Sequence, residues 1–373
     1  MNFIKKRPFL LLSVILFGLS IFARSQIYTL TNEDVVILQG WYRHFFKDGM
    51  SAFANENFSN YTPAYLYLLY ISRLFSNWFG DLIAIKLIPT LFDFVSAFAI
   101  FLLARIRYDG DRSFMLSAVF FALPTVVFNS TGWGQIESMY TSFLLLCAYF
   151  VLKEKPVYAM LMYGIAFSFK SQSIFFLPFL GILFLKGRIR WHHFFLIPMV
   201  YIVLGIPAAL LGRSWASILG IYITQVGQFH SLSMSAPNLY AFIPDIYYEP
   251  GVFVGMIIFF CVMAVWGWAN WRAIIKYEPP KLILMALASL VLVTFFLPKM
   301  HERYFYPVDI FSYAVVLFMP ELWFVLILYQ IVSGLSYSVF ILNASPVLVQ
   351  VAAVISTVLM VFILQKQLKS LKE

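Results

Sequence analysis

The sequence KLILMALASLVLVTFFLP at 281–298 is followed without a spacer by KMHERYFYP at 299–307. The first part is apolar over nearly the roughly 20 residues that an α-helix needs to cross a bilayer. The second part places His301, Glu302 and Arg303 at the end of that apolar run. Charged groups at membrane depth are costly and mark pathways or binding sites. This stretch therefore predicts a membrane helix that ends at a polar site.

The composition extends this prediction to the whole chain. Of 373 residues, 62% are hydrophobic and 12% are charged, whereas a soluble domain carries about 25% charged residues. Both cysteines, Cys147 and Cys261, lie inside apolar runs, which argues against a disulfide framework or a metal site. We therefore predict an all-α polytopic membrane protein that forms a single membrane-embedded domain over 1–373.

Basic residues set the expected orientation, because cytoplasmic loops of membrane proteins carry an excess of Lys and Arg. We interpret the net charge of +9 as the result of basic residues on cytoplasmic loops, rather than as a sign of nucleic-acid binding. With Lys5, Lys6 and Arg7 inside, most of the 26 basic residues become cytoplasmic, and both termini lie inside. We expect about twelve transmembrane helices, at 8–23, 82–104, 113–129, 137–152, 156–170, 172–186, 193–211, 250–270, 281–298, 304–319, 321–341 and 345–364.

The apolar run at 61–80 is predicted to lie at the membrane interface instead of crossing. It is rich in aromatic residues and interrupted by Arg73, which is typical of an amphipathic interfacial helix. If it crossed, the basic loop at 105–112 and every later basic loop would be inverted. The first external loop is then 24–81, with interfacial helices, and the second long external loop is 212–249.

Polar residues gather at the helix ends that this topology places outside. Five such segments suggest the rim of one external cavity, because polar clusters at membrane depth mark sites. The segments are 31–49 with Asn60 and Tyr61, 129–138, 169–173, 212–249 and 299–307. On the cytoplasmic side, DGD at 109–111 is interpreted as an ordinary turn. Lys86 and Asp93, both within the predicted membrane helix 82–104, are interpreted as a structural pair.

Asp34 is the candidate general base. Apolar residues at helical spacing from Val35 to Phe46 predict a short amphipathic helix, and Thr31 and Asn32 form the expected N-cap region. A carboxylate at this helix start, just above the bilayer, suits proton abstraction from a substrate hydroxyl. The alternative is that Glu33 and Asp34 only complement the helix dipole, and the residues alone leave both readings open.

The order of these motifs resembles the GT-C superfamily of glycosyltransferases, which take sugars from polyprenyl-phosphate carriers. The nearest branch looks like prokaryotic relatives of the enzyme that adds the second mannose to glycosylphosphatidylinositol. KMHERYFYP resembles a His-Glu-Lys/Arg motif of dolichyl-phosphate-sugar-dependent enzymes, and GWGQIES resembles Trp-Gly-Gln-Xaa-Asp-Ser with Glu137 in place of Asp. The other matching segments are ENFSNYTPAYLYLLY at 56–70, FSFKSQSIFFLP at 167–178 and APNLY at 236–240.

The resemblance implies an inverting transfer of mannose or another hexose, with Asp34 as the base. Arg303, His301 and Lys170 would bind the donor phosphate. The residues expected to bind the sugar or the acceptor are Glu302, Trp133, Gln135, Glu137, Gln172, Asn60, Tyr61, Arg43, His230 and Asn238. The expected partners are a polyprenyl-phosphate-linked sugar, a glycan, lipid or protein acceptor, and the bilayer.

No cofactor is required by this mechanism, although Glu33, Asp34 and Glu137 offer an alternative carboxylate set for a divalent metal. No cleavage pattern follows the run at 8–23, which suits a prokaryotic plasma membrane as well as an endoplasmic one. The external active site is expected in a prokaryotic plasma membrane. Two other functions compete with the transferase. One is a flippase or transporter of lipid-linked sugars, and the other is a glycan polymerase or ligase that needs no early external carboxylate.

Overall fold

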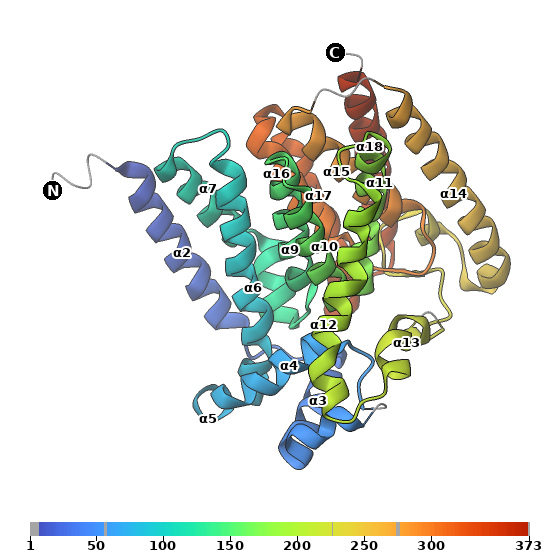
Figure 1. Cartoon of the computed structure of the whole chain (residues 1–373). Helices are drawn as coiled ribbons and strands as arrows, with labels where there is room; N and C mark the ends of the chain where they lie inside the picture. Colours follow the sequence, from blue (N-terminus) through green and yellow to red (C-terminus); the bar gives the residue numbers. More distant parts are fainter. Residues whose placement is uncertain (1–6, 56–57, 226, 274–276, 372–373) are drawn as a thin grey trace. The chain divides into compact units, whose positions relative to one another are not determined.

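The protein is described here from a computed structural model that places residues 7–55, 58–225, 227–273 and 277–371. Helices form nearly all of this part of the chain (Figure 1). Its strands are the two-residue segments β1 (Ser233–Met234) and β2 (Met300–His301). The following residues lie outside the described part: Lys5, Lys6, Lys276 and Lys372, which were predicted to be cytoplasmic, and 56–57 at the start of one motif.

The chain divides into two compact units. Unit 1 comprises Met1–Cys147, Val157–Ser171 and Phe194–Gln228, and unit 2 comprises Ala148–Pro156, Gln172–His193 and Phe229–Glu373. Unit 1 contains all or most of α2 (Pro8–Ile27), α3 (Glu33–Asp48), η1 (Gly49–Ala54), α4 (Pro63–Ser72), η2 (Arg73–Phe75), α5 (Ser76–Phe79), α6 (Asp81–Ala104), α7 (Gly110–Phe121), α8 (Pro124–Val127), the π-helical turn η3 (Phe128–Trp133), α9 (Glu137–Leu152), α10 (Pro156–Phe169), α12 (Leu196–Leu210) and α13 (Trp215–Gln225). Unit 2 contains all or most of η4 (Ser171–Phe176), α11 (Leu177–Leu185), η5 (Trp191–Phe195), η6 (Leu239–Phe242), η7 (Asp245–Tyr247), α14 (Tyr248–Arg272), α15 (Pro279–Phe296), η8 (Glu302–Phe305), α16 (Tyr306–Phe318), η9 (Pro320–Leu322), α17 (Trp323–Ile341) and α18 (Val347–Ser370).

In unit 1, α6 is the helix on which the others assemble. It packs against α7 and η3, and α7 packs in turn against α2. The short helices α3 and α4 also contact α6, and Figure 1 shows them gathered at the end of α6 where that helix begins. Asp109 caps α7 by accepting a hydrogen bond from the backbone N–H of Arg112 at 2.9 Å, so DGD is the turn that the sequence predicted.

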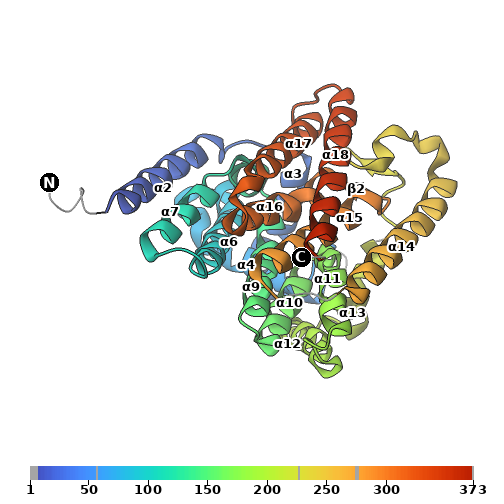
Figure 2. The same cartoon turned by 90° about the horizontal axis from the view of Figure 1, so that it is seen from above.

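In unit 2, the apolar run that opens at Lys281 forms the buried helix α15. Its residues from Leu282 to Phe295 are all buried, because α11, α14, α16 and α18 contact it (Figure 2). The helix ends at Phe296, and Leu297 is extended, as expected for the residue before a proline such as Pro298.

Among the described residues, seven helices are long and apolar enough to cross a membrane, or eight if the bent pair Gly110–Phe121 and Pro124–Trp133 is one span. Each of the twelve predicted ranges falls on helical structure, but the count of twelve is not confirmed. The other four predicted spans fall on short helices of the described chain: α9 has 16 residues, α10 has 14, η4 with α11 has 15, and α16 has 13. At about 1.5 Å per residue, such helices rise less than the roughly 30 Å of a bilayer core.

The segment at 61–80 is not one continuous helix, and it is absent from the candidate spans of the described chain. It breaks into α4, η2 and α5, and it ends at Gly80 with φ of +79°. Its last turns expose large apolar side chains, with Leu74 71% and Trp78 75% exposed. This geometry fits the predicted interfacial helix, and its placement at a membrane surface stays a prediction.

Candidate active site

Asp34 lies in the first turn of α3 and is half-buried. The side chain of Asn32 caps this helix by accepting a hydrogen bond from the backbone N–H of Val35 at 3.0 Å, as the sequence predicted. Val35, Leu38 and other residues on one face of α3 are buried, which fixes the rotation of the helix. Asp34 is therefore held at a defined position in the first turn of α3.

Two side chains from a segment about 100 residues away orient this carboxylate. The indole N–H of Trp133 donates to Oδ2 of Asp34 at 2.8 Å, and the Gln135 amide donates to the same oxygen at 2.7 Å. Trp133 is fully buried, so its indole is held in place at the Asp34 carboxylate. We call Asp34, Trp133 and Gln135 the carboxylate cluster.

Gly134 allows the two donors to reach one oxygen. Its φ is +80°, in the left-handed region that favours glycine. A Cβ at this position would meet Cγ of Lys86 at 3.2 Å and Cγ2 of Val35 at 3.4 Å. The chain can therefore reverse tightly between Trp133 and Gln135 only because this residue has no side chain.

Lys86 of α6 connects the two segments that carry the cluster. Its ammonium donates to the carbonyl of Leu30 at 2.5 Å and to the carbonyl of Gly132 at 2.8 Å. Leu30 lies four residues before Asp34, and Gly132 directly precedes Trp133. Lys86 is fully buried, so this cation fixes the separation of the two backbones.

Arg24, and not Lys86, is the partner of Asp93, so the predicted pairing of Lys86 with Asp93 is wrong. Nη1 of Arg24 donates to Oδ2 of Asp93 at 2.7 Å, and both side chains are buried. The same nitrogen donates to the hydroxyls of Ser130 at 2.9 Å and Thr131 at 2.8 Å. The pairing differs because Lys86 and Asp93 lie about 10 Å apart along one helix, while α2 brings Arg24 to Asp93.

Glu137 and Lys170 form a buried ion pair beside the carboxylate cluster. Glu137 is two residues beyond Gln135, so the pair belongs to the same part of unit 1. The Lys170 ammonium also lies 5.9 Å from the ring centre of Tyr61. The neighbouring Asn60 amide donates to Gln228 at 2.9 Å. Tyr61, Glu137 and Lys170, which come from three of the predicted polar segments, thus lie together in unit 1.

Arg43, which was predicted to bind the sugar or the acceptor, lies away from Asp34 in unit 1. It lies on α3 nine residues beyond Asp34, which corresponds to about 13 Å along the helix axis. Its side chain is exposed.

In unit 2, residues 299–303 form what we call the basic turn, and backbone pairing holds it. β2 runs parallel to β1, with Met300 opposite Ser233 and His301 opposite Met234. The His301 ring is mostly buried and lies 5.0 Å from the ring centres of both Phe229 and Tyr304. Glu302 and Arg303 pair with each other at 3.2 Å.

The loop segment 236–240 of unit 2 packs against the end of α15, the helix that precedes the basic turn. Asn238 is fully buried, and its side-chain amide oxygen Oδ1 accepts a hydrogen bond from the backbone N–H of Tyr240 at 3.0 Å. The Tyr240 hydroxyl donates to the carbonyl of Phe296 at 2.7 Å, and burial raises the pKa of Tyr240 to about 12. The exposed His230 contacts the ring of Tyr248.

Gln172, the remaining predicted residue, is half-buried in η4. Phe175 of the same turn lies 6.0 Å from the Tyr304 ring. Across the part of the chain that the structure describes, no group of three or more His, Cys, Asp or Glu side chains is arranged to hold a metal ion. The expectation that no cofactor is needed stays a prediction.

Sequence reasoning missed the supporting cations of the carboxylate cluster. Arg24 was assigned no role from the sequence, and Lys86 was assigned to the wrong partner. The available signal was their position, because a cation within or next to a membrane-spanning run must be compensated by polar groups.

No protein-family model matches this chain. The chain is similar to GPI mannosyltransferase 1 of Saccharomyces cerevisiae, with 26% identity over 170 residues. The match covers 45% of this chain and 41% of that protein, so it spans less than half of the relative's length. This similarity suggests a glycosyltransferase-like family. The finer resemblance to the enzyme of the second mannose stays a prediction.

Proposed function

We propose that this protein is a membrane glycosyltransferase of the GT-C type that moves a mannosyl or other hexosyl group from a polyprenyl-phosphate donor to an acceptor hydroxyl. The observation that carries the proposal is the carboxylate cluster, in which Trp133 and Gln135 fix one oxygen of Asp34. The similarity to a mannosyltransferase supports the reaction class. The seven or eight candidate spans of the described chain support a membrane setting.

In the proposed reaction, Asp34 takes the proton of the acceptor hydroxyl. The acceptor oxygen then attacks the anomeric carbon, the bond from that carbon to the phosphate oxygen breaks, and polyprenyl phosphate leaves with the bonding electrons. Attack opposite the leaving group inverts the anomeric centre. A base held in a fixed direction accelerates such proton transfer, and this is the contribution of Trp133 and Gln135.

The leaving phosphate gains negative charge, which cations of the protein would stabilise. We assign this role to Arg303, His301 and Lys170. A guanidinium suits two phosphate oxygens at once. The Glu302 carboxylate, paired with Arg303 at 3.2 Å, would orient it.

The other polar residues of the two units are proposed to bind the sugar or the acceptor. They are Gln135, Glu137, Gln172, Asn60, Tyr61, Arg43, His230 and Asn238. The distribution of basic residues favours an active site on the non-cytoplasmic face, with both termini in the cytoplasm. We propose that the membrane is a prokaryotic plasma membrane.

The test is product analysis with purified protein and a panel of polyprenyl-phosphate sugars, read by mass spectrometry. Asp34→Asn keeps the shape of the side chain and both donors but removes the base, so transfer should fall about 1000-fold. Glu33→Gln is the matched control, since Glu33 is the exposed carboxylate beside it in the same turn, and should stay near wild type. Full transfer by Asp34→Asn would refute the proposed base.

The competing functions give different results in the same preparation. A flippase would move labelled lipid across vesicles without forming a new product. A polymerase or ligase would form product regardless of Asp34. Product that forms from a single lipid-linked hexose and depends on Asp34 distinguishes the transferase from both.

A further inference from the structure

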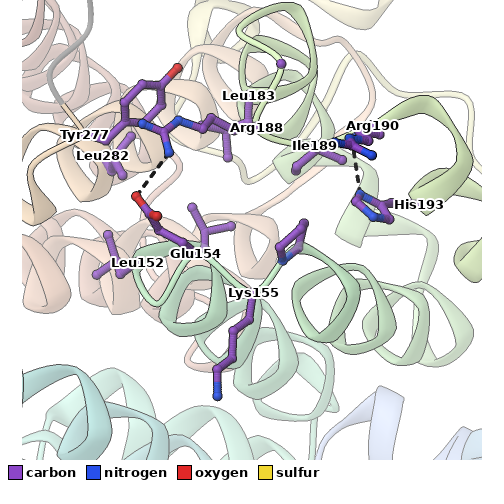
Figure 3. A pocket seen from close by; sticks show the side chains of 13 residues that line it. Leu152, Glu154, Lys155, Leu183, Arg188, Ile189, Arg190, His193, Tyr277 and Leu282 are labelled. Atoms are coloured by element: carbon purple, nitrogen blue, oxygen red, sulfur yellow. Dashed lines mark hydrogen bonds and ion pairs between the residues drawn. The ribbon is translucent and has the colours of Figure 1, made fainter.

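Unit 2 contains a cavity of about 430 Å³ that has no part in the proposed reaction. It is lined by the loop between α9 and α10, by the loop after α11, and by the residues that precede α15 (Figure 3). Its polar side chains include Glu154, Arg188, Arg190, His193 and Tyr277. Lys155 also borders the cavity, but its side chain points away from these groups in Figure 3.

Arg188 is held in the cavity wall by two contacts. Its guanidinium lies 3.7 Å from the ring centre of Tyr277, a distance at which a cation and an aromatic face attract each other. Nη1 also pairs with Glu154 at 3.1 Å. Both charged side chains keep solvent access, with 43% of Arg188 and 71% of Glu154 exposed, so a ligand can reach the guanidinium.

His193 and Arg190 provide donors on the opposite side. The backbone N–H of Arg190 donates to Nδ1 of His193 at 3.1 Å. Because Nδ1 accepts this bond, the ring proton of neutral His193 resides on Nε2, which makes Nε2 a donor. Two arginines and one histidine therefore line a cavity whose lining includes a single carboxylate, that of Glu154.

The loop that carries these groups is fixed to the neighbouring helix. The Lys186 ammonium donates to the carbonyls of Trp271 at 2.6 Å and Ala273 at 2.5 Å, at the end of α14. A preformed site loses less entropy on binding than a mobile loop would. The cavity is thus built before any ligand arrives.

Apolar surface adjoins the cations. Leu152, Leu183 and Leu282 line the cavity beside the arginines. Trp191 next to Arg190 is 66% exposed, and Trp271 is 49% exposed. Exposed tryptophans next to basic residues at the ends of apolar helices are typical of the membrane–water interface.

We propose that this cavity binds the phosphate headgroup of an anionic membrane lipid. The phosphate would lie between Arg188 and Arg190 and accept from Nε2 of His193, while the adjoining acyl chains pass over the leucine wall. Glu154 competes with the phosphate for Arg188. Anionic lipids attract basic residues near the membrane surface, and the apolar wall favours a lipid over a free phosphate.

The experiment titrates the purified full chain in neutral detergent by calorimetry with three probes. Dihexanoyl phosphatidic acid is the lipid phosphate, glycerol 3-phosphate is the same headgroup without acyl chains, and dihexanoyl phosphatidylcholine is the neutral lipid. We expect phosphatidic acid to bind at least about tenfold more tightly than either of the others, because it alone satisfies both the arginines and the apolar wall.

Variants assign this binding to the cavity. The double variant Arg188→Gln, Arg190→Gln should weaken binding of phosphatidic acid about tenfold or more, and Glu154→Gln should tighten it because Arg188 loses its competitor. The opposite signs separate a ligand effect from misfolding. Arg272→Gln, an exposed arginine of unit 2 that does not line the cavity, should leave the affinity unchanged.

Equal affinity for glycerol 3-phosphate and phosphatidic acid would overturn the lipid assignment in favour of a soluble phosphate. Unchanged binding by the double arginine variant, or weaker binding by Glu154→Gln, would overturn the site itself.

Discussion

The carboxylate cluster of unit 1 and the basic turn of unit 2 are both polar sites in an apolar protein, but they are held in different ways. In the cluster, side chains from segments about 100 residues apart bond to Asp34, and the buried cation Lys86 ties those segments together. In the basic turn, the parallel pairing of β1 with β2 and the rings around His301 hold the backbone.

This difference shows where each site is vulnerable. A buried cation that loses its partner, or a carbonyl that loses its cation, carries a large penalty. Backbone pairing does not depend on which side chain is present. Substitutions that remove charge should therefore damage the support of the carboxylate cluster most, whereas substitutions in the basic turn should affect ligand binding more than folding.

The largest effect is expected from Arg24→Met. The change leaves the Asp93 carboxylate buried without its cation, which should lower the free energy of unfolding by about 3–5 kcal/mol. Unfolding in a titration with denaturing detergent measures this loss. Arg105→Met, at an exposed arginine after α6, is the control. The double variant Arg24→Met, Asp93→Leu should recover much of the stability, and a double variant as unstable as the single one would contradict this account.

A smaller loss should follow Lys86→Met, which keeps the length of the side chain but leaves the carbonyls of Leu30 and Gly132 without their donor. The loss of both hydrogen bonds should lower the free energy of unfolding by about 1–3 kcal/mol in total, and Asp34 should shift relative to Trp133. Both unfolding and transfer rate should be measured. Lys366→Met removes a surface ion pair with Glu321 and should change neither. If Lys86→Met kept full transfer activity, Lys86 would not position the cluster.

Trp133→Phe tests one bond of the cluster. An aromatic ring remains at this position, but the indole N–H that donates to Asp34 is lost. The kcat should therefore fall about tenfold, as expected for a hydrogen bond to a charged group. Trp78→Phe serves as the control, since Trp78 is 75% exposed. A changed KM with an unchanged kcat would assign Trp133 to substrate binding instead of to orientation of Asp34.

The smallest effect on stability is expected from His301→Phe in the basic turn. Phenylalanine keeps the ring contacts with Phe229 and Tyr304, so the free energy of unfolding should change by less than about 1 kcal/mol. The donor phosphate would lose one partner, and KM for the lipid-linked sugar should rise about tenfold. A large loss of stability with a normal KM would show that His301 supports folding instead of phosphate binding, which would contradict the proposed difference between the two sites.

The sequence predicted some local features of the site correctly. Asn32 caps α3 as expected because capping depends on residues only a few positions apart. The partner of Asp93 was not predictable in this way, because Arg24 lies 69 residues away. The role of Gly134 was equally hidden, since the need for a missing Cβ appears only when Lys86 and Val35 are packed against it.

What the sequence by itself determined is the membrane character of the chain and the positions of its helices. Apolar length and backbone hydrogen bonding leave the helix as the available spanning structure, and the composition of each run is sufficient to recognise it. Only the tertiary structure decided which polar groups satisfy each buried charge. Helical periodicity indicates the face of a residue, but the neighbour on that face comes from another segment, and its identity depends on how the helices pack.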